Sequence, residues 1–181
     1  GQTELRAAYD SVHGDYDQFW LASAGRAVRE LVDRLILKGR ERVFEAGCGT
    51  GFGTALLAPR VKQVDAVDLS AGMIAEARKR MEKGGYRNVR FATGDALEAL
   101  KARGPFDLVF STWVLGYIPP RPFYAAAESA LVPGGRLAFV VHCDHSPQEA
   151  LDIFNELVAR DPAVLLKQVS FDFPVSPDQV R

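Results

Sequence analysis

The 181-residue sequence is 48% hydrophobic and 25% charged, which is ordinary for one globular domain with a single core. Its formal net charge of −1 favours neither nucleic acid nor an anionic membrane surface as a partner, and no apolar run approaches the roughly 20 residues of a membrane span. The two cysteines, Cys48 and Cys143, lack paired spacing, so we expect a cytoplasmic protein without a disulfide framework or a four-cysteine zinc site.

The first predicted element is a helix over residues 21–37. Apolar residues recur in this segment at helical spacing, with charged residues on the other side, and Lys38-Gly39 ends the pattern. We expect residues 1–40 to form an N-terminal helical cap on one domain that spans residues 1–181.

Five short apolar runs follow the first helix, and each has the length of a strand. They cover residues 42–46, 63–67, 89–92, 106–110 and 136–142, the last after a turn signal at Pro133-Gly134-Gly135. Helical segments near residues 54–59, 71–83, 96–101 and 122–131 lie between them. This alternation predicts an α/β fold, a three-layer, doubly wound, mostly parallel sheet of the Rossmann-like kind. The strands lack polar alternation, as expected when helices cover both faces.

The segment between the first strand and the next helix reads VFEAGCGTGFGT, residues 43–54, and carries four glycines at alternate positions. Glycine allows positive φ values and lets a ligand lie against bare backbone, and a helix N-terminus favours an anion. A plain tight turn is the alternative interpretation. Doubly wound sheets bind ligands at the carboxyl ends of their strands, so the loop predicts a nucleotide-like ligand there.

The spacing of these glycines distinguishes between ligands. The dinucleotide fingerprint G-x-G-x-x-G fails here, because its third glycine would fall on Phe52 or Thr54. The pattern present is acidic-x-G-x-G-x-G, formed by Glu45, Gly47, Gly49 and Gly51. In this pattern the chain resembles the class I S-adenosylmethionine-dependent methyltransferases, whose first motif has the same spacing.

Two carboxylates at the ends of the second and third strands extend the resemblance. Asp68 can accept hydrogen bonds from both ribose hydroxyls, and Asp95 can accept one from an adenine amino group while the Ala96 N–H donates to a ring nitrogen. The alternative is that Asp95 and either Asp68 or Ser70 only cap the helices that follow them.

The resemblance runs from about residue 9 to residue 142 and implies S-adenosylmethionine as cofactor and S-adenosylhomocysteine as product. It implies that Glu45 holds the methionine amino group, often through water. The residues that we expect to bind the cofactor are Tyr9, Glu45, Gly47, Cys48, Gly49, Gly51, Asp68, Leu69, Met73, Asp95, Ala96 and Ser111.

The segment after the fourth strand predicts the class of acceptor. Enzymes that methylate DNA base amines usually carry Asn/Asp-Pro-Pro-Tyr/Phe there, whereas this chain has Ser-Thr-Trp-Val-Leu at residues 111–115. The pattern resembles the small-molecule branch of the family, so we expect methyl transfer to O, N or C of a small molecule by a monomer or homodimer. Trp113, Tyr117 and His142 are the expected substrate residues, with His145 as the expected base and Tyr16 as its alternative.

Two further segments invite interpretation. Residues 8–20 resemble an N-terminal segment that lies over the methionine end of the cofactor in the small-molecule branch, although Phe19 and Trp20 also suit a helix packed on the core.

The His-Cys-Asp-His run at residues 142–145 has the chemistry of metal ligands. A zinc site, however, needs three or four ligands that neighbouring groups hold in place, so we expect no metal.

The end of the sequence departs from the family pattern. A complete domain of this class continues with a helix and two strands that form an antiparallel edge. Here residues 147–159 suggest a helix, residues 167–173 an extended segment and residues 176–179 a helix start. We therefore expect the closing edge strands to be incomplete, with the edge covered by another segment or subunit, or the chain to be a fragment. The remaining functional alternatives are a non-catalytic S-adenosylmethionine-binding or scaffold domain and an NAD-dependent oxidoreductase.

Overall fold

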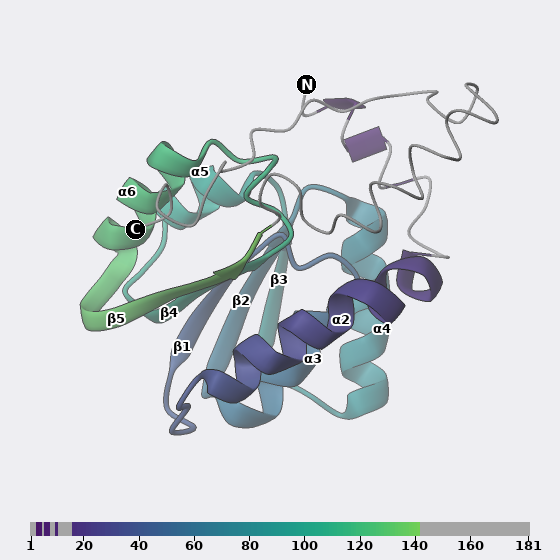
Figure 1. Cartoon of the computed structure of the whole chain (residues 1–181), viewed down its shortest axis with the longest axis horizontal. Helices are drawn as coiled ribbons and strands as arrows, with labels where there is room; N and C mark the ends of the chain where they lie inside the picture. Colours follow the sequence, from purple (N-terminus) through teal and green to yellow (C-terminus); the bar gives the residue numbers. More distant parts are fainter. Residues whose placement is uncertain (1–2, 5, 8–9, 11–15, 142–181) are drawn as a thin grey trace.

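The computed structural model describes residues 3–4, 6–7, 10 and 16–141, and gives side-chain surroundings along the first long helix from residue 24 onward. Strands and helices alternate along the chain (Figure 1). The strands are β1 (Arg42–Ala46), β2 (Gln63–Asp68), β3 (Val89–Thr93), β4 (Phe106–Thr112) and β5 (Leu131–Val140). The helices are α2 (Tyr16–Arg34), α3 (Phe52–Leu57), η1 (Ala58–Arg60), α4 (Ala71–Gly84), α5 (Ala96–Lys101) and α6 (Pro120–Ala130).

The five strands form one parallel sheet in the order β3-β2-β1-β4-β5. The chain moves outward from β1 to β3, then returns to the other side of β1 with β4. The order therefore reverses at β1, and the carboxyl ends of β1, β2 and β4 meet at the reversal, where doubly wound sheets bind ligands. This confirms the predicted three-layer, doubly wound α/β fold.

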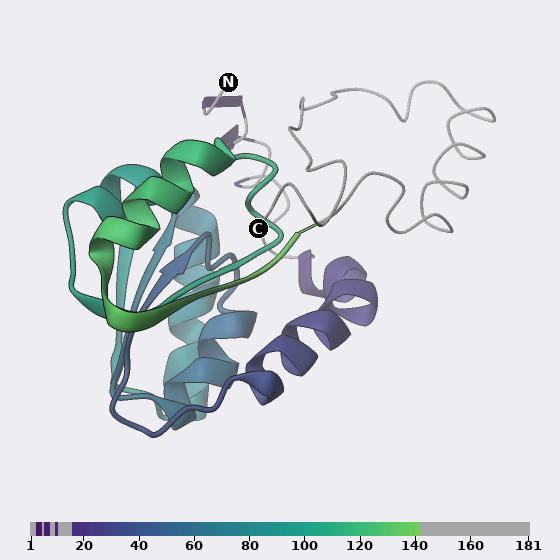
Figure 2. The same cartoon turned by 60° about the vertical axis from the view of Figure 1, so that its left-hand side comes forward.

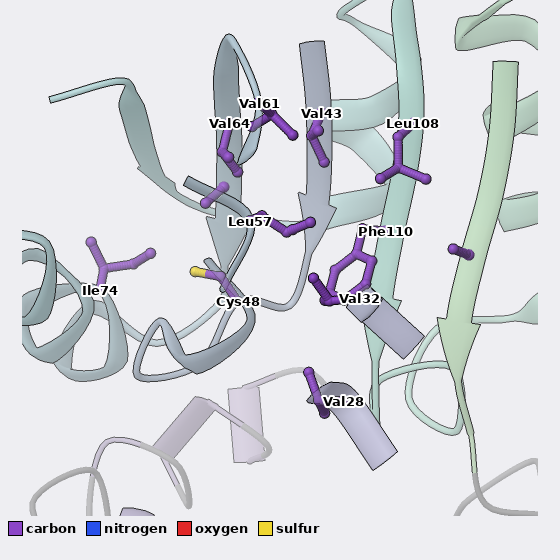
Figure 3. Packing of buried hydrophobic residues seen from close by; sticks show 12 residues of the cluster. Val28, Val32, Val43, Cys48, Leu57, Val61, Val64, Ile74, Leu108 and Phe110 are labelled. Atoms are coloured by element: carbon purple, nitrogen blue, oxygen red, sulfur yellow. The ribbon is translucent and has the colours of Figure 1, made fainter. Parts of the chain in front are cut away.

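Successive residues of each central strand point to opposite faces of the sheet, because side chains alternate along a strand. Val43, Val64 and Leu108 belong to one core cluster, whereas Phe44, Val67 and Val109 belong to the other. Figure 3 shows the first cluster, in which Val28 and Val32 of α2 and Leu57 of α3 face the sheet. Both faces of the strands are buried, which explains why their sequences lack polar alternation.

The helices form the two outer layers (Figure 2). Helices α2, α3 and α4 contribute to the first core cluster, and α5 and α6 contribute to the second. Ser70 caps α4 by accepting a hydrogen bond from the Met73 N–H at 3.1 Å, and Gly85 ends the helix in a left-handed conformation. The Ser70 cap fixes where α4 begins after β2, and so helps to position the residues between them.

The predicted boundaries hold within a few residues for β1 to β4, α4 and α5, but not for the last strand. We expected a turn at residues 133–135 before a strand at residues 136–142, whereas β5 begins at Leu131. Phe106 pairs with Leu131 and Leu108 pairs with Arg136, so residues 132–135 bulge between two pairings. The turn signal is thus a bulge within the strand, with Gly134 at φ 77°.

The first helix also differs from its predicted limits, since α2 ends at Arg34 rather than at residue 37. The expectations for residues 147–159, 167–173 and 176–179, and for the closing edge strands, lie outside the described residues. Within the described part of the chain, no helix combines the length and the apolar character that crossing a membrane requires.

Candidate functional site

The glycine loop joins β1 to α3 and hydrogen bonds to the neighbouring strand. The backbone N–H groups of Gly47 and Cys48 both donate to the Val67 carbonyl, at 2.8 and 3.0 Å. Gly49 has φ 52°, and the space where its Cβ would stand is open, whereas a side chain at Gly47 would collide with Val114. Gly49 therefore leaves bare backbone in a left-handed conformation that suits glycine. Gly51 faces α4, where an added Cβ would come within 3.0 Å of Ala77.

Asp68 connects the end of β2 to this loop. Its carboxylate accepts from the Gly49 N–H at 2.8 Å through Oδ2 and from the Ser70 N–H at 2.9 Å through Oδ1. Burial raises the pKa of Asp68, an effect that these backbone N–H groups oppose and the nearby Asp10 carboxylate reinforces. Asp10 also accepts from the Ser70 hydroxyl and, at 3.3 Å, from the Gly72 N–H.

Asp95 follows β3 and caps α5. Its Oδ1 accepts from the N–H groups of Leu97 at 2.7 Å and Glu98 at 3.1 Å, so the capping role considered from the sequence is present. One carboxylate oxygen has more than one acceptor direction, and Oδ2 lies beside this bonded oxygen, so capping is compatible with a ligand contact.

A cleft that is partly open to solvent lies at the carboxyl ends of the strands. The cleft brings together nine residues expected from the sequence to contact cofactor or substrate and four that sequence reasoning missed. The expected residues are Gly47, Gly49, Asp68, Leu69, Met73, Asp95, Ala96, Trp113 and Tyr117, and the missed ones are Gly94, Thr112, Val114 and Ile118.

The missed residues had a signal in the sequence. Thr112, Val114 and Ile118 belong to the segment after β4 that also contains Trp113 and Tyr117, and Gly94 precedes Asp95. All follow the carboxyl end of a strand, which is where the topology gathers ligand-binding segments. Their side-chain directions, however, depend on the path of the segment after β4, including the left-handed backbone of Trp113 at φ 62°.

A second cleft opens on the other side of the glycine loop, where α2 faces α3. It shares Gly47, Gly49, Thr112 and Trp113 with the first cleft. Its other described lining residues are Ala24, Gly25, Val28, Cys48, Thr50, Phe52 and Gly53. Cys48 is otherwise part of the core, where burial raises the pKa of its thiol well above the usual value (Figure 3).

Two expected cofactor residues lie behind the clefts. Ser111 is fully buried, and its hydroxyl donates to the Ala46 carbonyl at 3.2 Å. Glu45 is 1% exposed, and its Oε2 accepts from the Thr54 hydroxyl at 2.6 Å. Burial raises the pKa of Glu45 to about 8, with the hydrogen bond from Thr54 opposing this shift and the Asp68 charge adding to it.

Several expected site residues lie outside what the structure describes. Tyr9, His142 and His145 fall in undescribed positions, and for Tyr16 only the helical backbone is described. Among the described residues, no cluster of three or more His, Cys, Asp or Glu side chains has an arrangement that could hold a metal ion.

Comparisons with known proteins agree with this geometry. Residues 43–135 match a family described as methyltransferase domain. Protein-L-isoaspartate O-methyltransferase 2 of Syntrophobacter fumaroxidans is 34% identical over 114 residues, which cover 63% of this chain and 44% of the relative. Protein-L-isoaspartate O-methyltransferase 1 of an Anaeromyxobacter species is 37% identical over 112 residues, or 61% of this chain and 50% of the relative. The chain thus spans about half the length of the curated relatives it matches.

A solved structure also resembles this chain. The DhpI–SAH complex, where SAH is S-adenosylhomocysteine, has a TM-score of 0.63 and 31% sequence identity. The match covers 78% of this chain and 69% of that chain. The similarity therefore extends over most of this chain.

Proposed function

This chain belongs to the methyltransferase-domain family, and from that membership we propose that it binds S-adenosylmethionine and transfers the methyl group to a small-molecule acceptor. The fold is that of the class I S-adenosylmethionine-dependent methyltransferases. The observation that carries the proposal is the first cleft, in which Gly49, Asp68 and Asp95 meet at the strand ends.

The described residues fit the chemistry of the cofactor. A ribose diol would donate to the Asp68 carboxylate, and an adenine amino group would donate to Asp95 while the Ala96 N–H donates to a ring nitrogen. Met73 is 1% exposed and Leu69 lies beside it in the cleft wall, so both provide apolar surface for a planar base. The Glu45 side chain would hold the amino group at the methionine end of the cofactor.

Bound S-adenosylmethionine supplies an activated methyl group on a sulfonium. In the displacement, the S–CH₃ bond breaks as the acceptor–CH₃ bond forms, and any proton on the acceptor leaves to a base or to water. The protein's residues therefore need to align the acceptor with the S–C bond and exclude water. Trp113 has the largest side chain among the four residues that line both clefts, and we propose that it contributes to both tasks.

A small-molecule acceptor is supported by the largely apolar surroundings of Trp113, Tyr117 and Ile118 in the first cleft. We propose His145 as the base for an acceptor that must lose a proton, with His142 as a substrate contact and Tyr16 and Tyr9 on the N-terminal side. A general base contributes roughly 100- to 10,000-fold in rate. His145→Ala should lower turnover by at least about 100-fold without changing cofactor affinity, and unchanged turnover would remove His145 from this role.

We also propose a cytoplasmic location and a monomeric or homodimeric state.

One comparison favours a second candidate acceptor. The matched relatives from Syntrophobacter and Anaeromyxobacter are protein-L-isoaspartate O-methyltransferases, so an isoaspartyl carboxylate in a protein is the alternative. Those matches cover half or less of the relatives.

Two measurements test the proposal. Isothermal titration calorimetry should give binding of S-adenosylmethionine and S-adenosylhomocysteine and none of NAD; binding of NAD alone would refute the cofactor. Transfer of a radioactive methyl group should then be assayed against small-molecule metabolite fractions and an isoaspartyl peptide. Transfer to the peptide alone would establish the second candidate, and cofactor binding without any transfer would favour a non-catalytic binding domain.

A further inference from the structure

The carboxyl group of Glu45 is held in a closed pocket between β1 and α3. Thr54 is 0% exposed and Glu45 is 1% exposed, and the Thr54 hydroxyl donates to Glu45 Oε2 at 2.6 Å. The other oxygen, Oε1, lies against Gly53, where an added Cβ would come within 2.6 Å of it. The turn of α3 at residues 53–54 therefore fixes both oxygens of the carboxyl group.

The titratable groups around Glu45 supply no positive charge that would stabilise its carboxylate form. Asp68 at the end of β2 raises its pKa, and the Cys48 thiol in the glycine loop stays neutral because burial raises the thiol pKa. On α2, the guanidinium of Arg29 packs on the Phe52 ring, 4.8 Å from its centre, and forms no ion pair with Glu45. Within the described part of the chain, Glu45 forms no ion pair. A buried carboxylate without a cation is costly, so the group is held protonated near neutral pH.

The second cleft lies close to this carboxyl group. Gly53 lines that cleft and also contacts Glu45 Oε1, so a single glycine separates the carboxyl group from the cleft. The cofactor's α-ammonium and sulfonium groups are both positive, and the low-polarity surroundings would make their attraction for a carboxylate stronger than in water.

We propose that Thr54 is a positioning residue for cofactor binding: its hydroxyl orients Glu45 toward the cofactor's amino-acid end, and binding expels the proton that Glu45 holds in the free protein. The proposal rests on the proposed cofactor. The O–H bond of the Glu45 carboxyl group breaks, the proton passes to the buffer, and the carboxylate remains opposite the incoming cation.

The sign of the pH dependence follows from linkage. The free protein holds the proton below about pH 8, and a bound cation lowers the pKa of Glu45 in the complex. Between these two pKa values each binding event releases up to one proton, so the Kd falls as pH rises, by at most about tenfold per pH unit. Above the free-protein pKa this dependence ends. Thr54 stabilises the carboxylate, so its loss should move the upper limit to higher pH.

Calorimetry of the full chain tests this inference. S-adenosylhomocysteine, which keeps the ammonium, is titrated in two buffers of different ionisation enthalpy, from pH 6 to 9, to count released protons. The cofactor's own amino group titrates at about 7.7–8.0, so Glu45→Gln provides the baseline. 5′-Methylthioadenosine, which lacks the amino-acid portion, serves as the matched ligand control. Thr54→Val removes the hydroxyl at nearly constant volume, and Thr54→Ser restores it.

The expected result has three parts. Wild type releases more protons than Glu45→Gln, and 5′-methylthioadenosine releases none. Thr54→Val weakens S-adenosylhomocysteine binding at pH 7 by about tenfold, the loss of one hydrogen bond to a charged group, and shifts the pH profile upward. Thr54→Ser behaves as wild type. Equal proton counts in wild type and Glu45→Gln would overturn the inference, as would an unshifted profile in folded Thr54→Val.

A second measurement covers the case in which Glu45→Gln binds too weakly for calorimetry. The ¹³C NMR signal of the Glu45 carboxyl group, assigned by its loss in Glu45→Gln, should titrate near pH 8 in the free protein and at lower pH with saturating S-adenosylhomocysteine. An equal midpoint in both states would overturn the inference while leaving the cofactor assignment intact. Failure of wild type to bind S-adenosylhomocysteine at all would instead refute the proposed function.

Discussion

The Asp68 carboxylate accepts a hydrogen bond from the Gly49 N–H at 2.8 Å, which joins the end of β2 to the glycine loop that leaves β1. The glycine loop and Asp68 are two of the sequence features from which the site is predicted, and they form one unit. A second backbone bond, from the Ser70 N–H at 2.9 Å, fixes the carboxylate from the α4 side. The side chain therefore holds the loop and faces the cleft at the same time.

Asp68→Ala should weaken S-adenosylmethionine binding by about 1.5–3 kcal/mol, the range for hydrogen bonds to a charged group. The loss of the Gly49 bond adds to this by freeing the loop. Calorimetric titration measures the change. Asp33→Ala is the control, because it removes an exposed carboxylate paired with Arg60 outside the cleft. An unchanged dissociation constant for Asp68→Ala would exclude Asp68 from the site.

Gly49→Val should abolish cofactor binding in a protein that still folds. The side chain would enter the open space in front of the loop, and the left-handed backbone, with φ 52°, would cost on the order of 1–2 kcal/mol. Gly39→Val is a matched control, because Gly39 has φ 78° and open space but lies in the turn after α2. Circular dichroism and calorimetry compare the two. Full affinity in folded Gly49→Val would contradict the loop assignment.

Cofactor binding should change the fluorescence of Trp113, because this residue lines both clefts. The sequence has two tryptophans, Trp20 and Trp113. Trp20→Phe leaves Trp113 as the emitter and should keep the response to S-adenosylhomocysteine, whereas Trp113→Phe should lose most of it. A fluorimetric titration of both variants decides, and a response that depends on Trp20 would place the ligand elsewhere.

Glu41→Gln should destabilise the protein at neutral pH without affecting the clefts. Glu41 is 7% exposed, and its carboxylate accepts from the N–H groups of Lys38 at 2.7 Å and Arg40 at 3.1 Å. Burial acts to raise the pKa of Glu41, but these backbone groups outweigh it, and the pKa is lowered from its usual 4.5. Hydrogen bonds to a carboxylate imply a loss of about 1.5–3 kcal/mol at pH 7.

The pH dependence of Glu41→Gln provides its check. Because the folded-state pKa is lowered, the stabilising effect of Glu41 is fully present above the unfolded-state pKa and is lost as pH falls through the folded-state value. Urea unfolding of wild type and Glu41→Gln should therefore give stabilities that converge as the pH falls below the unfolded-state pKa of about 4.3 and the folded protein takes up the proton. A difference that stays constant across this acid titration would show that the charge on Glu41 is not the cause.

The sheet could be predicted well from the sequence, because each strand is one short, continuous apolar run and clear helical patterns separate the runs. The first strand is identical in prediction and structure, at Arg42–Ala46. The fifth strand was misjudged at its start because Leu131 becomes a strand residue by pairing with Phe106, a contact far away in the sequence. Pro133 and Gly134 give a turn signal, but not whether the chain bulges or reverses.

The candidate site also has a part that the sequence predicts and a part that depends on packing between distant residues. Gly49, Asp68 and Asp95 follow strand ends, so topology alone brings them together, and their roles as cofactor ligands stay predictions. The partners of Glu45 and Gly51 were not predictable, because Thr54 and Ala77 are placed by the packing of α3 and α4. The lining by Val114 depends on its close approach to Gly47, which no sequence pattern specifies.

The attachment of Gly47 and Cys48 to the Val67 carbonyl makes the glycine loop a continuation of the sheet. Its order is established when the protein folds, so a ligand meets a preorganised surface and the entropy of ordering the loop does not weaken binding. In native-state hydrogen exchange, the Gly47 and Cys48 amides should open together with the β1–β2 pairing rather than with surface turns. Mutations that loosen β2 would then weaken ligand binding from a distance, through the backbone hydrogen bonds that join the loop to Val67.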